Sequence, residues 1–173
     1  MRFRMNGYQA GGRELKKYYF AYGANTNLSA MASRCPASIC IGKVVLNGFR
    51  LVFRSEADIE EGGNGILHGA LWTITPECEA ALDIFEGYPR YYTKRTVVVA
   101  HGELGEVEAM VYTRTRRTSQ EPPRRGYRDL IAQGYADFDI PSEQLHQAVR
   151  QAERQYRREI REIREAEYEF TGR

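Results

Sequence analysis

The middle of the chain is a succession of short strand-like segments separated by turn residues. Segments at 17–21, 39–53, 65–73, 93–100 and 106–113 are rich in β-branched and aromatic residues, and the last alternates apolar and polar residues as a half-buried strand does. Gly48 is expected to bend the second segment. Few helices interrupt these strands, and helical patterns follow at the end of the chain. This order predicts an α+β fold in which the sheet can curl into a barrel.

Helix signals flank the strands. Residues 76–86 have Thr75 as a suitable N-cap, Pro76 at the first position and Gly87 at the end. A short helix is expected near residues 127–133, and a long one closes the chain.

Two loops of opposite charge are expected between these elements. The stretch "SEADIEEGGNG" at 55–65 is acidic and glycine-rich, and "TRTRRTSQEPPRRG" at 113–126 is basic. The basic loop leaves open an adaptor that binds nucleic acid or another protein.

Composition limits the classes of function. The 173 residues suffice for one domain with a core, and a net charge of +2 does not require a nucleic-acid or membrane partner. Residues 1–14 are expected to be a mobile leader, residues 15–141 one domain and residues 142–173 a charged helix. No apolar segment indicates a secretory signal or a membrane span. The three cysteines form no C-x-x-C pair, as is typical of reduced thiols, so a cytoplasmic protein is expected.

The segment 142–173 has the most regular pattern in the chain. Apolar residues recur at helical spacing and form one narrow stripe: Leu145, Val149, Ala152, Tyr156, Ile160 and Ile163. Arginines and glutamates balance here and are spaced for pairing on one helix, which argues against a nucleic-acid arm. Two interpretations stay open: a helix that lies across its own domain with a solvated far end, or a helix that pairs with a partner. The protein is accordingly expected to be a monomer or a homodimer.

Most common active-site patterns are absent from the sequence. His68, His101 and His146 are scattered without a metal-binding spacing, so no metal is expected. The chain also lacks a nucleophile elbow and a phosphate-binding glycine loop. An acid–base site without a cofactor is the remaining possibility.

Glu86 in "ALDIFEGYPRYY" is the strongest candidate for such chemistry. Leu82 and Phe85 are expected to anchor its helix in the core. The tyrosines that follow are expected to surround its carboxylate: Tyr88, Tyr91 and Tyr92. Burial among aromatic rings raises the pKa of a carboxyl group and makes it a better base. The alternative is a solvent-exposed glutamate on an amphipathic helix.

The stretch "YYFAYGANTN" at 18–27 leads a tyrosine-rich strand into a Gly-Ala-Asn turn. Such a turn presents backbone N–H groups that can hold an anion or a carbonyl oxygen. It is also an ordinary way to end a strand.

These motifs together resemble those of the γ-glutamylcyclotransferase-like (AIG2-like) family. The segment "YFAYGANTN" at 19–27 is similar to the family's YGSN-type loop, and "LDIFEGYPRYY" at 82–92 is similar to its LD-x-x-EG-x-x-x-Y segment, whose glutamate is the catalytic acid/base. Further similar segments follow the family's order: "RCP" at 34–36, "GFRLVF" at 48–53, "HGALWTIT" at 68–75 and "PPRRGYRDLIAQGY" at 122–135. The resemblance extends over residues 18–140 and implies a small mixed β-barrel with flanking helices and a site at its mouth.

The resemblance also implies an intramolecular reaction. The free α-amine of a γ-glutamyl group attacks its own γ-carbonyl, the ring closes to 5-oxoproline, and an amine or amino acid leaves. Glu86 is implied as the general acid/base. The implied substrate-binding residues are Tyr19, Phe20, Ala21, Tyr22, Gly23, Ala24 and Asn25, with Tyr127 on the opposite wall. No cofactor is implied.

Two positions depart from the family pattern. Ala24 stands where serine is frequent, and Thr26 where leucine or methionine is common, so the substrate preference stays open. The YGSLIW-type loop of the glutathione-specific ChaC-like branch is absent, which makes glutathione a poor first candidate. A module that binds a small molecule without turnover is a further alternative.

Overall fold

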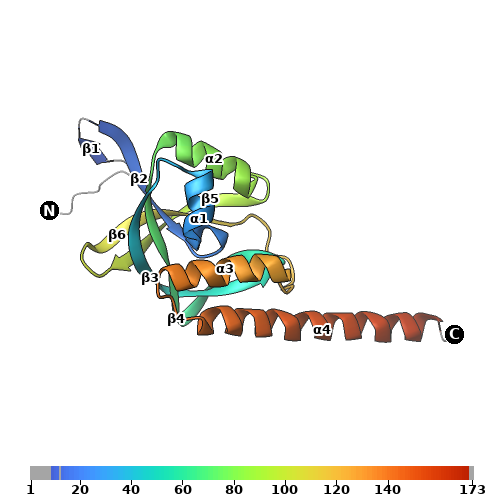
Figure 1. The fold of residues 1–173 in the computed structure, drawn as a ribbon. Helices are drawn as coiled ribbons and strands as arrows, with labels where there is room; N and C mark the ends of the chain where they lie inside the picture. The colour runs from blue at the N-terminus through green and yellow to red at the C-terminus, as the bar shows by residue number, and fades with distance from the viewer. Residues whose placement is uncertain (1–8, 12, 172–173) are drawn as a thin grey trace.

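A five-stranded barrel forms the body of the molecule in the computed structural model, which describes residues 9–11 and 13–171 (Figure 1). Its strands are β2 (Arg13–Ala21), β3 (Ile39–Arg54), β4 (Glu56–Ile74), β5 (Tyr92–His101) and β6 (Gly105–Arg114). They pair antiparallel in the order β2-β4-β3-β5-β6, and a parallel pairing of Tyr19 with Met110 closes the barrel. This mixed barrel with flanking helices confirms the predicted α+β class.

Short helices cover the ends of the barrel. They are η1 (Ala24–Thr26), α1 (Leu28–Arg34), α2 (Pro76–Glu86) and α3 (Arg125–Asp137). The predicted start and end of α2 are confirmed, because the Thr75 side chain accepts a hydrogen bond from the backbone N–H of Cys78 and Gly87 adopts a left-handed φ of 63°. Helix α1 was not predicted, although Asn27 caps it by accepting a hydrogen bond from the Ala30 N–H at 2.9 Å.

The prediction of an acidic loop at 55–65 is wrong. Most of it belongs to β4, which pairs with β3 from Arg54–Glu56 onward, and the chain reverses at Ser55 with a φ of 62°. The carboxylates are used inside this hairpin: buried Arg54 lies 3.2 Å from Asp58 and also contacts Glu60. Since their charges are neutralised across the strands, acidic residues do not prevent pairing here. The predicted irregularity at Gly48 is confirmed, with a φ of 79° and a shift of register.

The N-terminal strands differ from the expected leader. A short strand β1 (Gln9–Gly11) pairs antiparallel with β2, and β2 itself begins at Arg13. Residues 9–11 and 13–14 therefore belong to strands, while 1–8 lie outside the described residues.

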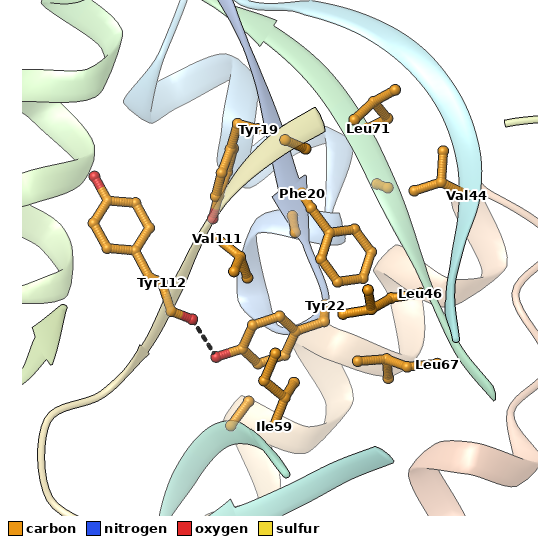
Figure 2. Close-up of a cluster of buried hydrophobic side chains, with 14 of the residues drawn as sticks. Tyr19, Phe20, Tyr22, Val44, Leu46, Ile59, Leu67, Leu71, Val111 and Tyr112 are labelled. Carbon is orange, nitrogen blue, oxygen red and sulfur yellow. Dashed lines mark hydrogen bonds between the residues drawn. The ribbon is translucent and has the colours of Figure 1, made fainter. Parts of the chain in front are cut away.

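The barrel interior is filled by apolar side chains from every strand. Figure 2 shows Phe20 among Val44, Leu67 and Leu71, all with at most 1% of their surface exposed. In the same view the Tyr22 hydroxyl donates a hydrogen bond of 2.7 Å to the Tyr112 carbonyl oxygen. This bond links the end of β2 to β6 across the mouth of the barrel.

The long helix α4 (Glu143–Thr171) packs on β3 with its first half and extends past the barrel with its second (Figure 1). Leu145, Ala148 and Ala152 are buried, whereas every side chain from 161 to 170 is exposed. Across the described residues, no helix combines the length and apolar character that a membrane crossing needs.

Gln144 ties the start of α4 to the barrel. Its amide accepts a hydrogen bond from the backbone N–H of His68 and donates one to the His68 carbonyl, each at 2.9 Å. It also donates to the Tyr135 hydroxyl at 2.7 Å, and that hydroxyl donates to the Tyr22 carbonyl at 3.0 Å. Helix α4 is therefore linked, through the Tyr135 side chain of α3, to the chain where β2 ends.

Candidate functional site

A pocket opens at the mouth of the barrel, between the end of β2, the end of α2 and the start of α3. It is narrow, with a cavity volume of about 30 Å³, and about 320 Å³ of empty space when the open solvent at its mouth is included. Its walls are formed by Tyr19, Tyr22, Gly23, Ala24, Asn25, Ala57, Phe85, Glu86, Tyr92, Tyr112 and Tyr127.

The pocket brings together six of the eight residues expected to bind substrate, and Glu86, the expected acid/base, lines it as well. The exceptions are Phe20 and Ala21, which lie in the core with 0% and 1% of their surface exposed. Phe20 points to the face of the strand opposite to that of Tyr19, and its ring is directed against Gly69. Their side chains support the strand and do not reach the pocket.

Glu86 lies at the last position of α2, with its carboxylate toward the turn that follows β2. Its Oε1 atom accepts a hydrogen bond of 3.0 Å from Asn25 Nδ2. Burial raises the pKa of Glu86 to about 7, against the effects of the Arg34 charge and the Asn25 hydrogen bond. The carboxyl group can therefore both take up and release a proton near neutral pH.

Gly23 lets the turn approach the opposite wall. A Cβ atom at this position would lie 3.0 Å from the Ala57 side chain and 3.4 Å from the Tyr127 hydroxyl. That hydroxyl accepts a hydrogen bond of 3.3 Å from the Ala57 N–H, and burial raises the pKa of Tyr127 to about 12. Tyr127 thus stays protonated at neutral pH and can donate a hydrogen bond to a ligand.

Thr26 serves the turn and not the pocket. It is fully buried, and its hydroxyl donates to the Gly23 carbonyl oxygen at 2.7 Å. Of the two departures from the family pattern, only Ala24 lines the pocket.

The predicted surroundings of Glu86 need correction. Phe85 does not anchor α2, because 46% of its surface is exposed; Cys78 and Leu82 are the buried residues of that helix. Tyr88 and Tyr91 are also exposed, and they lie against Lys94 and Gly87. Among the predicted tyrosines only Tyr92 lines the pocket. The remaining tyrosines of the pocket are Tyr19 in β2, Tyr22 directly after β2, Tyr112 in β6 and Tyr127 in α3.

Arg34, the first residue of the "RCP" segment at 34–36, is a neighbour of the site to which the sequence analysis gave no role. Its Nη1 atom donates a hydrogen bond of 2.7 Å to Asn25 Oδ1, and its Cζ atom lies 3.7 Å from the centre of the Phe85 ring. Because Arg34 is distant from Asn25 and Phe85 along the chain, no local sequence pattern predicts these contacts. Among the described residues, no cluster of three or more His, Cys, Asp or Glu side chains is placed to hold a metal ion.

Comparisons with known proteins identify the family and the fold of the chain. The family described as "Gamma-glutamyl cyclotransferase, AIG2-like" matches residues 19–134. A solved structure described as "Gamma-glutamyl cyclotransferase" is 24% identical with a TM-score of 0.69, covering 77% of this chain and 86% of its own. A human protein described as uncharacterized protein loc79017 is 25% identical with the same TM-score and coverage. YkqA from Bacillus subtilis is 22% identical with a TM-score of 0.66, covering 79% of this chain and 54% of its own.

A search among curated protein sequences finds no match. The family match nevertheless spans the barrel, the turn after β2, Glu86 and Tyr127, and the structural neighbours share the fold. The chain therefore belongs to the AIG2-like γ-glutamyl cyclotransferase family.

Proposed function

We propose that this protein is a γ-glutamyl cyclotransferase that converts a γ-glutamyl amine or γ-glutamyl amino acid to 5-oxoproline and the free amine, with Glu86 as general acid/base. The family and the fold support an activity of this type. The observation that carries the proposal is the position of Glu86. It is a partly buried carboxyl group with a pKa raised to about 7, at a pocket lined by the turn that follows β2 and by tyrosines.

In this reaction the substrate supplies its own nucleophile. The α-amine transfers a proton to Glu86, and its nitrogen forms a bond to the γ-carbonyl carbon. The proton then moves from Glu86 to the nitrogen of the leaving amine as the original C–N bond breaks. Because Asn25 engages Oε1, we assign proton transfer to Oε2. No water is consumed, and no cofactor takes part.

The other walls of the pocket have roles that suit this chemistry. The turn at Tyr22–Asn25 supplies backbone donors for the carboxylate or carbonyl oxygens of the substrate. Tyr127 supplies a hydroxyl from the opposite side. Holding the chain of the γ-glutamyl group in a folded conformation brings the two reacting atoms together, which can contribute up to about 7–11 kcal/mol to lowering the barrier.

The test is to incubate the purified protein with a panel of γ-glutamyl amines and γ-glutamyl amino acids and to identify products by mass spectrometry. We expect 5-oxoproline with at least one member of the panel, and none with the Glu86→Gln variant. Free glutamate as the product would show hydrolysis and would refute the proposal. Tight binding without turnover of any member would favour a binding module.

A further inference from the structure

We propose that Arg34 is a positioning residue of the candidate active site: its hydrogen bond fixes the side-chain amide of Asn25 so that the NH2 group faces the Glu86 carboxylate. This inference deepens the proposed function by assigning control of the acid/base group. The observation behind it is the set of contacts of the Asn25 side-chain amide, whose oxygen accepts hydrogen bonds and whose NH2 group donates them.

The orientation of the Asn25 amide follows from the chemistry of its partners. A guanidinium has only donors, so the atom that faces Arg34 at 2.7 Å must be the amide oxygen. The NH2 group then points the other way. There it donates to the Tyr19 hydroxyl at 2.9 Å and to Glu86 Oε1 at 3.0 Å. If the amide turned over, its oxygen would face the carboxylate, and both groups would be acceptors.

Arg34 is itself held in place. It is the last residue of α1, where a cation is favoured by the helix dipole. Its guanidinium lies over the Phe85 ring at 3.7 Å, next to Glu86 in the chain. Asn25 is 97% buried, so its amide has little access to water as a substitute partner. One arginine thus joins η1, α1 and α2 at the site.

The charge that acts on Glu86 also comes from Arg34. The titratable side chains around the carboxylate are Tyr19 from β2, Tyr22 directly after β2, Tyr92 from β5, Tyr112 from β6, Tyr127 from α3 and Arg34 from α1. Burial raises the pKa of each of these tyrosines above its ordinary value, so they are neutral where Glu86 titrates. Arg34 therefore favours the ionised carboxylate by its charge directly and by a second route, through Asn25.

The experiment follows the titration of the Glu86 carboxyl carbon by NMR, assigned with the Glu86→Gln variant. It compares the wild type, Arg34→Met, Asn25→Ala and the double variant. Arg125→Met is the control, since Arg125 lies on α3 with 88% of its side chain exposed. We expect Arg34→Met to raise the Glu86 midpoint by about one pH unit or more, and the control to leave it unchanged. We expect the increase to be smaller when Asn25 is already alanine.

Two results would overturn the proposal. An unchanged Glu86 midpoint in Arg34→Met would show that Arg34 does not act on Glu86. If Arg34→Met raised the midpoint equally or more in the Asn25→Ala background, the charge of Arg34 would act alone, without Asn25. If circular dichroism shows that Arg34→Met does not fold, Arg34→Gln, which also removes the charge, replaces it under the same criterion. The titration needs no turnover, so it tests the positioning role of Arg34 even if the protein forms no 5-oxoproline. In an active protein, the acid limb of the pH profile of kcat/KM must move in the same direction as the midpoint.

Discussion

Asn25 Nδ2 lies 3.0 Å from Glu86 Oε1 although the two residues are 61 positions apart in the chain. The contact joins the turn that follows β2 to the end of α2. It places a donor on one carboxylate oxygen and leaves the other for a substrate.

Replacing Glu86 by glutamine should remove the base and keep the contact with Asn25. The amide oxygen of glutamine can still accept the hydrogen bond, but the side chain cannot take up a proton from the substrate amine. We expect kcat to fall by about 100-fold or more with little change in the circular dichroism spectrum. The matched control is Glu77→Gln, an exposed position on the same helix, which should retain the wild-type rate. A Glu86→Gln variant with near-normal turnover would disprove the assignment.

The same variant should change how stability depends on pH. The folded pKa of Glu86, about 7, lies above the ordinary value of 4.5, so the folded state binds the proton more tightly than the unfolded state. The contribution of Glu86 to stability is therefore present at low pH and is lost as pH rises from about 4.5 to 7. At pH 8, Glu86→Gln should be more stable than the wild type by about 1–3 kcal/mol, discounted for partial exposure, and at pH 4 the two should converge. Urea unfolding at both pH values measures this, and a constant difference would contradict it.

Blocking the α-amine of the substrate should abolish turnover whatever amine is attached at the γ-position. An acetylated nitrogen is a very poor nucleophile, so the ring cannot close. Activity on the free substrate should rise with pH as the amine loses its proton, from an unperturbed pKa of roughly 8. A γ-glutamyl amine and its N-acetyl form, compared by mass spectrometry, test this. Cleavage of the acetylated compound would indicate attack by water.

Gly134→Ala should destabilise the protein although alanine is the better helix former. A Cβ at this position would lie 2.4 Å from Thr26 Oγ1 and 2.5 Å from the Asn27 backbone nitrogen, where α3 packs on η1. We expect the free energy of unfolding to fall by about 1–3 kcal/mol. Gly126→Ala is the control on the same helix, since nothing lies within 4 Å of its Cβ, and it should be neutral or stabilising. Thermal melts of both variants decide, and equal melting temperatures would contradict the close packing.

Removing the chain beyond Arg157 should leave a monomer-sized protein with near-normal kinetics. Most side chains beyond this point are exposed, and exposed charge pairs add little stability. Light scattering after size exclusion measures the mass before and after truncation. If truncation instead converted a dimer into a monomer, the far half of α4 would be an assembly element. A longer cut at Leu145, which is 2% exposed, should destabilise the domain, and no effect of that cut would exclude both interpretations.

The barrel and much of the site could be predicted because their signals are local. Alternation marked the strands, Thr75 and Gly87 marked the bounds of α2, and two motifs marked the turn and Glu86. The hairpin at Ser55 was missed because the charged and glycine residues of this segment are typical of a loop. The pairing of its acidic residues with Arg54 cannot be recognised from composition. Phe85 was misjudged, and Arg34 was given no role, for the same kind of reason. Their environments depend on how α1 packs against α2, and the local sequence of neither helix specifies that packing.

The side chain of Gln144 occupies the place that a neighbouring strand would take beside His68. Strand β2 pairs with β4 as far as Ala21 and Ala70 and then turns away, which leaves the His68 peptide groups facing outward. An open backbone edge of this kind can recruit a strand from another molecule and start aggregation. The amide of Gln144 pairs with the N–H and the carbonyl of His68 much as a peptide group would. The first turn of α4 thus protects this edge, and a nascent or cleaved chain that lacks it would expose a site for self-association.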